Sequence, residues 1–288
     1  MNWITGIQNA VDYLEEHITD ELDFAVIAKQ AACSPFYFQR IFGILCGIPL
    51  GEYIRGRRLT LAGSELSLTG AKVIDVALKY GYDSPESFTR AFSRFHGITP
   101  SEVKRDGGCL KSLSRVSVQI ILKGGSVMDY KIVKKKAFQV LEKVEKQSID
   151  DTQNQNTIPD FWTRSHKDGT VEMLLKQTPD RSFIYGICYS NEPTNSKTFD
   201  YSIAAVYGGG EIPAGFRLAE IPEQMWVVFG VTGAMPDAIQ KTWHRIYAEF
   251  FPTSNYRPTY EMNIEAYSAG MMTAADYQSE IWVPVEKQ

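Results

Sequence analysis

Apolar residues recur at helical spacing through the first hundred positions of the chain. Two nine-residue stretches, SPFYFQRIF at 34–42 and SPESFTRAF at 84–92, follow the same frame. In each copy the serine is a favoured helix N-cap, and the proline after it suits the first helical position. Behind the caps, apolar residues return on one helical face, at Phe38, Ile41, Phe42 and Leu45 and again at Phe88, Ala91, Phe92 and Phe95. The pattern predicts two short helices with matching buried faces.

Each of these helices is preceded by another short helical pattern, within FAVIAKQAACS at 24–34 and within VIDVALKYGYDS at 73–84. Gly81 suits the tight turn inside the second unit, and Ala32 holds that place in the first. Each unit therefore predicts a helix-turn-helix whose second helix can enter a major groove.

Residues 49–68, between the two units, predict one long helix. Twenty helical residues span about 30 Å, which is close to the roughly 34 Å of one turn of B-DNA. We expect this helix to hold the two second helices in successive major grooves on one face of the DNA.

The outward faces of the two capped helices carry the candidate DNA chemistry. These positions are Phe36, Gln39 and Arg40 in the first copy and Glu86, Ser87, Thr89 and Arg90 in the second. Gln and Arg can make bidentate contacts to adenine and guanine, Glu accepts from cytosine, and Phe contacts the thymine methyl. Arg55, Arg57 and Arg58 on the long helix can contact phosphate. For each of these positions, a merely solvated helix surface is the alternative interpretation.

Charge and composition narrow the function. The chain has 288 residues, enough for two domains, and a net charge of -4 that argues against broad nucleic-acid binding. Residues 30–105, however, hold ten Lys and Arg against six acids. Four scattered cysteines and four scattered histidines predict no disulfide framework, metal site or cofactor. No apolar run is long enough to span a membrane, and no signal peptide is recognised, so we expect a cytoplasmic protein.

The second half of the chain reads as an α+β domain. Strand candidates alternate with two helical stretches that begin near residues 157 and 236, and lie at 130–142, 183–190, 199–207, 225–232, 259–267 and 280–285. This order predicts a duplicated β-α-β-β unit. The full fold prediction is an all-α N-terminal domain with two helix-turn-helix units at 1–107, a linker at 108–127, and the duplicated α+β domain at 128–288.

Catalytic motifs are not found in the second half, where aromatic residues are the visible signal. In YEMNIEAY at 260–267, apolar even positions alternate with polar odd ones. From the pattern alone the odd face, including Glu265, lies in water. The alternative is an aromatic-lined cleft, where a carboxylate attracts a cationic ligand and ring faces add cation–π attraction.

Residues 20–104 resemble the DNA-binding domain of the AraC/XylS family. The resemblance is carried by IAKQAACSPFYFQRIF, GIPLGEYIRGRRL and VIDVALKYGYDSPESFTRAFSRFHGITPSEVK. It implies seven helices, two helix-turn-helix units and sequence-specific binding to a double-stranded operator. By the same resemblance, the seven outward positions named above are the ones that read bases. Ala32 departs from the glycine that relatives often carry at the first turn.

Residues 128–286 resemble a GyrI-like effector-binding domain. FDYSIAAVYGG, TWHRIYAEFFPTSNY, YEMNIEAY and SEIWVPV carry this resemblance. It implies a groove between two halves that takes organic, cationic or amphiphilic molecules, with Glu265 as its carboxylate. The aromatic positions that match are Tyr185, Tyr201, Trp226, Tyr267 and Trp282. Trp162 and Trp243 fall on helical positions and are interpreted as mainly structural.

Together these resemblances predict a ligand-responsive transcriptional regulator, and an activator by family habit, with the domain order of Rob-like proteins. The expected partners are operator DNA, a small-molecule effector and RNA polymerase, and no membrane. We expect no enzymatic activity. The alternatives are that the second domain hydrolyses a small molecule, with Glu265 and Tyr267 or Tyr185 as acid–base groups, or that it sequesters a protein.

Overall fold

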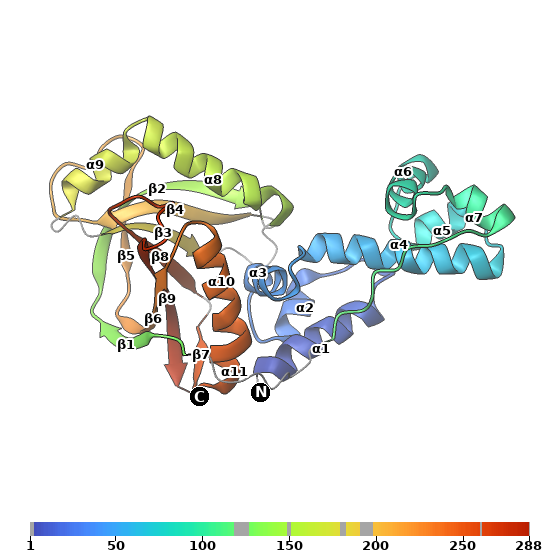
Figure 1. Ribbon diagram of the computed structural model, residues 1–288, viewed down its shortest axis with the longest axis horizontal. Coiled ribbons are helices and arrows are strands. Elements are labelled where there is room, and N and C mark those ends of the chain that lie inside the picture. Colours follow the sequence, from blue (N-terminus) through green and yellow to red (C-terminus); the bar gives the residue numbers. More distant parts are fainter. Residues whose placement is uncertain are drawn as a thin grey trace.

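A helical part and a curled β-sheet part lie side by side in an elongated molecule (Figure 1). The computed structural model describes residues 3–117, 127–148, 151–178, 183–190, 198–259 and 261–287. The long helix α4 points away from the sheet and carries the second helix-turn-helix unit at the far end of the molecule.

The first helix-turn-helix unit lies next to the sheet. Its helices are α1 (Trp3–Glu16), α2 (Phe24–Gln30) and α3 (Pro35–Cys46). The predicted N-cap of α3 is present, because the Ser34 hydroxyl accepts a hydrogen bond from the Tyr37 amide at 3.2 Å. Gly47 ends α3 in the left-handed conformation, with φ of 70°. The core of this unit is made by α1, α2 and the inward face of α3.

The second unit repeats the same local chemistry. It contains α5 (Val73–Lys79) and α6 (Pro85–His96), with α7 (Pro100–Asp106) after them. The Ser84 hydroxyl accepts from the Ser87 amide at 3.1 Å, and Gly97 ends α6 with φ of 84°. The predicted long helix is confirmed as α4 (Leu50–Thr69). The seven helices and the repeated frame are therefore present in the described part of the chain.

The chain after α7 packs back along α4. The Leu113 amide donates to the Thr60 hydroxyl at 2.9 Å, and Arg57 donates to the Leu113 carbonyl at 2.8 Å. The first part of the predicted linker is thus held against the helical domain. Residues 118–126 of that linker lie outside the described residues.

The second half forms one curled antiparallel sheet. Its strands are β1 (Tyr130–Lys135), β2 (Phe138–Ser148), β3 (Phe183–Tyr189), β4 (Thr198–Val206), β5 (Arg217–Ile221), β6 (Gln224–Thr232), β7 (Tyr256–Pro258), β8 (Met262–Ser268) and β9 (Gln278–Lys287). The strand order is β1-β6-β9-β8-β3-β4-β2-β5, and β7 pairs with β9. The predicted strand at 130–142 is two strands, because β1 pairs with β6 while β2 pairs with β4 and β5. The short strands β5 and β7 were not predicted.

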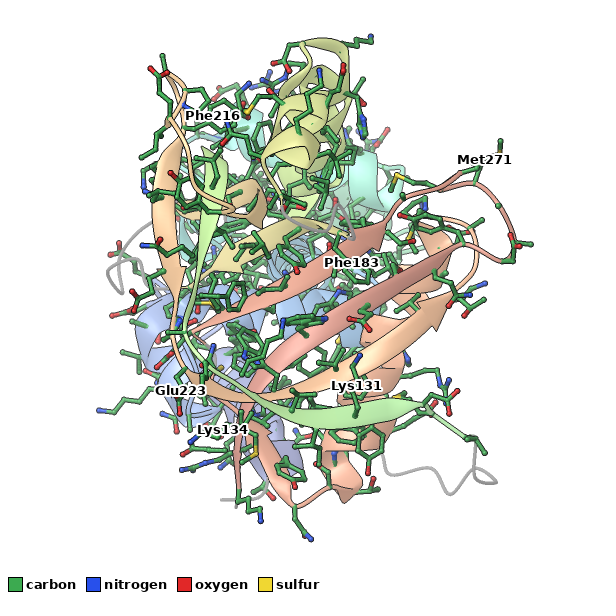
Figure 2. All side chains as sticks on the ribbon, turned by 90° about the vertical axis from the view of Figure 1, so that its left-hand side faces the viewer. Lys131, Lys134, Phe183, Phe216, Glu223 and Met271 are labelled. Carbon is green, nitrogen blue, oxygen red and sulfur yellow. The ribbon has the colours of Figure 1, made fainter. Side chains whose placement is uncertain are left out.

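Helices cover one face of this sheet. They are α8 (Asp151–Lys167), α9 (Thr170–Gln177), α10 (Asp237–Arg245), the π-helical turn η1 (Ile246–Phe250) and α11 (Phe251–Thr253). The main core lies between these helices and the sheet, and it continues without a break into α1, α2 and α3. On the opposite face of the sheet, the described residues form a separate core in which every member belongs to a strand. Figure 2 looks from the side of the molecule away from the helical domain, with Lys131 and Lys134 of β1 in the foreground.

Candidate functional site

The predicted base-reading face of α6 is open. Glu86 and Arg90 are exposed, and Ser87 and Thr89 are half-buried. The Ser87 hydroxyl also donates to the Ser84 carbonyl at 2.9 Å, which closes the first turn of the helix. This end of the molecule lies far from the sheet (Figure 1).

The same face of α3 is covered by the sheet domain. The Phe36 ring lies 4.1 Å from the Phe199 ring of β4, measured between centroids, and Phe36 is only 7% exposed. Gln39 is half-buried, and its amide donates to the Pro35 carbonyl of its own helix at 3.4 Å. Arg40 reaches into the sheet domain, where its side chain is 16% exposed.

Arg40 enters a cluster of groups that we call the carboxylate cage, formed by Glu265, Trp243, Cys188 and Tyr267. The Arg40 Nη2 atom lies 3.4 Å from Glu265 Oε1, and its Nη1 atom lies 2.9 Å from the Cys188 sulfur. The guanidinium carbon lies 4.7 Å from the centroid of the Trp243 ring, within cation–π range. The cage therefore already holds an organic cation, which belongs to the protein itself.

Glu265 is fixed in place by two aromatic donors. The Trp243 indole nitrogen donates to Oε1 at 2.7 Å, and the Tyr267 hydroxyl donates to Oε2 at 2.8 Å. The Glu265 side chain is 14% exposed. The two donors therefore fix the orientation of the Glu265 carboxylate beside Arg40.

The strands place these side chains by simple alternation and register. Asn263, Glu265 and Tyr267 of β8 point toward the helices, so the odd face of this strand does not lie in water. Glu265 stands beside Gly186 of β3 in the sheet. A Cβ atom at Gly186 would collide with the Tyr201 hydroxyl, so glycine lets that hydroxyl reach across β3.

The tyrosines of the site stay neutral. Burial first, and the charge of Glu265 second, raise the pKa values of Tyr201 and Tyr267 well above the ordinary value. The Tyr201 hydroxyl accepts from the Trp162 indole nitrogen at 2.8 Å, and Trp162 packs edge-on against Tyr267 at 5.1 Å. Burial by itself lowers the pKa of Arg40, but the facing Cys188 and Glu265 outweigh it and raise that pKa.

The predicted ligand residues do not all come together. Glu265, Tyr267 and Tyr201 lie on the helix-covered face, whereas Tyr185, Trp226 and Trp282 belong to the core of the opposite face. Trp226 and Trp282 lie 6.0 Å apart there. The Lys135 ammonium lies 4.2 Å from the Trp282 ring, so this face also carries a cation–π contact within the chain. The single aromatic cleft expected from the sequence is thus divided by the sheet.

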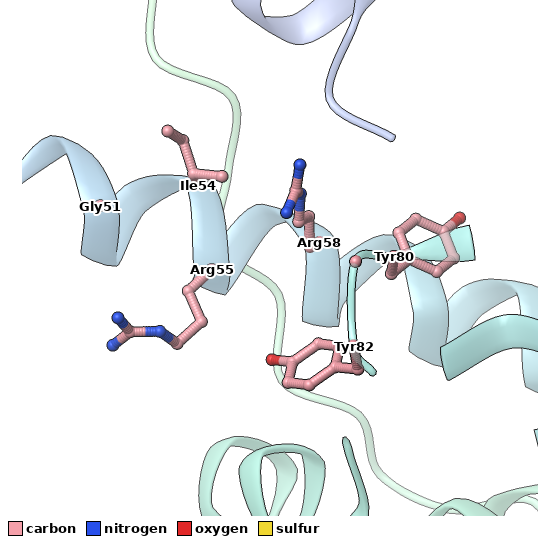
Figure 3. Close-up of a pocket in the computed structure, with 7 residues that line it drawn as sticks. Gly51, Ile54, Arg55, Arg58, Tyr80 and Tyr82 are labelled. Atoms are coloured by element: carbon pink, nitrogen blue, oxygen red, sulfur yellow. The ribbon is translucent and has the colours of Figure 1, made fainter. Parts of the chain in front are cut away.

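Arg55 is one of the residues that line the pocket shown in Figure 3. The pocket has a volume of about 250 Å³ and lies between α4 and the turn of the second helix-turn-helix unit, with Arg58, Tyr80 and Tyr82 in its wall. Arg58 donates to the backbone carbonyl groups of Ile18 and Asp20, whereas Arg55 is exposed. Of these two arginines, Arg55 is therefore the one whose side chain is open to solvent.

Sequence reasoning missed three members of the site. Trp243 was interpreted as mainly structural, yet it is both a donor to Glu265 and the ring beneath Arg40. Trp162 orients Tyr201, and Cys188 contacts Arg40. The alternation of β3 and β4 could have pointed to Cys188, because Cys188 stands beside Tyr201 in the register. No sequence pattern pointed to Trp243, because it lies on α10 and its partner Glu265 lies on β8.

Two kinds of feature are absent from the described residues. Among them, no group of three His, Cys, Asp or Glu side chains is arranged to hold a metal ion. Within the same ranges, no helix combines the length and the apolar character that crossing a membrane requires.

Known proteins resemble both parts of the chain. A family model described as integron-associated effector binding protein matches residues 131–285, and a helix-turn-helix domain model matches residues 27–106. The HTH-type transcriptional activator AarP of Providencia stuartii is 41% identical over 95 residues, which are 33% of this chain and 70% of AarP. The regulatory protein SoxS of Salmonella typhimurium is 41% identical over 98 residues, which are 34% of this chain and 92% of SoxS. A solved structure of SAV2435 bound to tetraphenylphosphonium has 22% sequence identity and a TM-score of 0.49, and the match covers 55% of this chain and 94% of that one.

The two helix-turn-helix units and the curled sheet, taken with these matches, define a DNA-binding protein with an attached effector-binding domain. The chain belongs to the integron-associated effector binding protein family, in which its GyrI-like second half is joined to an AraC-type helix-turn-helix domain. It is thus a transcriptional regulator of the AraC type with a C-terminal effector-binding domain.

Proposed function

We propose that this regulator reads its operator with α3 and α6 in successive major grooves of one DNA face. The base-reading residues in this proposal are Phe36, Gln39, Arg40, Glu86, Ser87, Thr89 and Arg90, and Arg55 contacts phosphate. Support comes from α4, whose twenty residues separate the two units by about 30 Å. One monomer then makes the two contacts that usually require a dimer.

The effector is an organic cation, and it binds in the carboxylate cage. The observation that carries this proposal is the Arg40 guanidinium, which already sits against Glu265 and the Trp243 ring as a stand-in cation. Glu265 supplies the opposite charge, and Trp243, Tyr267 and Tyr201 supply ring faces. Tyr185, Trp226 and Trp282 lie across the sheet, and their contribution is to shape the strands behind the cage.

The second domain consists of two related β-α-β-β units. Its strand order supports this, because β6, β9 and β8 on one side of the sheet correspond to β2, β4 and β3 on the other. Each unit also lends an edge strand to its partner, since β1 precedes β2 but pairs with β6, while β5 precedes β6 but pairs with β2. The domains divide at 1–107 and 128–288, with 108–127 as the connection.

The remaining parts of the proposal follow from DNA binding. A bacterial regulator of this kind works in the cytoplasm and, as an activator, contacts RNA polymerase. We expect that the protein does not turn over its effector, since the proteins that this chain resembles are named as regulators. The small molecule is held and released unchanged.

Genomic fragment selection, followed by footprinting at fixed salt, tests the DNA part of the proposal. We expect protection of two major-groove segments one helical turn apart. Protection of one segment alone, or of fragments without any shared sequence, contradicts it.

Titration with tetraphenylphosphonium, monitored by tryptophan fluorescence, tests the effector part. Tetraphenylborate has the same shape and the opposite charge, so it isolates the role of charge. We expect saturable binding of the cation, weaker binding after Glu265→Gln, and no binding of the anion in the cage. Equal binding of both ions contradicts a site that selects positive charge.

A further inference from the structure

We propose that the first recognition helix is withheld from DNA in this conformation, because Arg40 and the organic cation are alternative occupants of the carboxylate cage. The inference rests on the proposed function and adds the way in which the two domains communicate. The effector expels Arg40, and α3 then becomes free to enter the major groove.

The repeat provides an internal comparison. Arg40 and Arg90 occupy the same position of the nine-residue frame, as do Phe36 and Glu86. Arg90 and Glu86 are exposed on α6, whereas Phe36 is buried against Phe199 and Arg40 is held in the cage. A side chain that pairs with Glu265 cannot also contact a base edge. The present conformation therefore offers DNA only one of the two recognition helices.

The docked state of α3 depends on an interaction that a cation can replace. Arg40 pairs with the Glu265 carboxylate, and its guanidinium packs against the Trp243 ring. An organic cation that binds Glu265 and Trp243 takes both partners from the Arg40 guanidinium. A charged guanidinium that has lost its carboxylate partner in a largely buried site is strongly unfavourable. The helix must then leave, and the Phe36–Phe199 contact is lost with it.

This geometry restricts the effector and sets the direction of control. The ligand must carry a positive charge and present a flat or aromatic surface to Trp243, as the guanidinium does. Because it binds only when α3 is released, it raises the affinity for DNA. By linkage, DNA must raise the affinity for the cation by the same factor.

Glu265→Gln tests the proposal without any knowledge of the effector. The variant removes the charge partner of Arg40 and keeps the size of the side chain, so we expect operator DNA to bind at least about fivefold more tightly, the lower end of typical coupling. Glu280→Gln is the matched control. It removes the same charge from the same sheet, but Glu280 accepts from Trp282 and pairs with Lys131, away from α3. Equal DNA affinity of both variants and the wild-type protein overturns the proposal.

Alkylation of Cys188 tests the movement itself. Cys188 is 5% exposed and contacts Arg40, so its reaction with iodoacetamide reports whether α3 covers the cage. We expect saturating operator DNA to accelerate alkylation of Cys188 several-fold, while the exposed Cys109 reacts at an unchanged rate. Unchanged protection of Cys188 on DNA shows that α3 stays docked, and overturns the inference.

These outcomes separate the two proposals. If the wild-type protein and every variant fail to bind selected DNA, the proposed function fails. If the wild-type protein binds DNA while Glu265→Gln and Cys188 respond as the controls do, only the withholding of α3 fails.

Discussion

The side-chain nitrogen of Asn263 donates a hydrogen bond to the Tyr37 hydroxyl at 2.9 Å, and so joins β8 to α3. The Tyr37 hydroxyl donates in turn to the Met262 carbonyl at 3.4 Å. Both partners are buried, and burial raises the pKa of Tyr37 to about 12, so the phenol keeps its proton. Unlike Phe36 and Arg40, Tyr37 is not one of the proposed base-reading residues. A substitution of Tyr37 therefore changes the docking of α3 against the sheet domain without removing a proposed base contact.

Tyr37→Phe should weaken the docking of α3 and strengthen DNA binding. The substitution leaves a buried Asn263 amide short of a partner, at a cost of about 1–3 kcal/mol to the docked state only. Affinity for operator DNA, measured by titration at fixed salt, should rise. Tyr189→Phe is a suitable control, because it removes a hydroxyl that donates to buried Glu142 inside the sheet domain. A rise in DNA affinity for both variants would point to general loosening instead.

Arg40→Ala and Arg90→Ala should differ in their effects on DNA binding, although the two arginines hold equivalent positions. Arg90→Ala should cost about 1–3 kcal/mol of DNA affinity and relax specificity at one half-site. Arg40→Ala removes a base contact at the other half-site but also frees α3, so its net cost should be smaller. In the Glu265→Gln background α3 is already free, and Arg40→Ala should there cost the full amount. A double-mutant cycle measures this difference. Uniform weakening on all DNA sequences would instead make both arginines phosphate contacts.

The same pair of variants should differ in their affinity for an organic cation. Arg40→Ala empties the carboxylate cage, so tetraphenylphosphonium should bind it more tightly than it binds the wild-type protein. Arg90→Ala changes the net charge equally but leaves the cage occupied, and its affinity should equal that of the wild-type protein. Tryptophan fluorescence measures both affinities. If Arg40→Ala does not bind the cation more tightly, Arg40 and the cation do not compete.

Local chemistry made the helical half predictable from the sequence. Ser34 and Ser84 cap their helices through their own side chains, and the apolar spacing behind them fixes which face is buried. The strands were placed well where alternation was clear. The break at Lys136 and Ala137 was missed because no glycine or proline separates β1 from β2, although the two strands pair with different partners.

The fate of Arg40 could not be predicted in this way. Nothing in the repeated frame distinguishes Arg40 from Arg90, and the partner that does so lies 225 positions away in β8. The separation of the predicted aromatic ligand residues onto two faces of the sheet also depends on partners distant in the sequence. Alternation within β8 groups Glu265 with Tyr267, but only the register between strands shows that Tyr201 shares their face and Tyr185 does not.

The two helix-turn-helix turns should respond in opposite ways to exchange of alanine and glycine. Ala32 has φ of 52°, in the region that disfavours a side chain, while Gly81 holds the equivalent turn with φ of 79°. Ala32→Gly should stabilise the protein by about 0.5–1 kcal/mol, because the relief of strain exceeds the entropic cost of glycine. Gly81→Ala should destabilise it, since a Cβ atom there would lie 2.6 Å from Arg58 Nη1. Urea unfolding midpoints measure both changes. A loss of stability in Ala32→Gly would mean that the methyl group contributes packing that outweighs the strain.

His96 should make the stability of the helical domain depend on pH. The residue is 4% exposed, and its Nε2 atom lies 3.0 Å from the Leu59 carbonyl, while its Nδ1 atom accepts from the Lys111 amide at 3.2 Å. A carbonyl accepts and an amide donates, so the ring must be neutral, with the proton on Nε2. Burial lowers the pKa of His96 below its ordinary value of 6.5.

The sign of the effect follows from proton binding. As the pH falls below about 6.5, the unfolded chain takes up a proton at His96 that the folded protein refuses, and stability is lost. The stabilising contribution is complete above that pH and declines until the lower folded-state pKa is reached, at no more than about 1.4 kcal/mol per pH unit. Urea unfolding between about pH 7.5 and about pH 5.5 should show this decline in the wild-type protein. His96→Gln should flatten it, whereas substitution of the exposed His244 should leave it unchanged. An equal slope in the His96→Gln protein would assign the pH dependence to other groups.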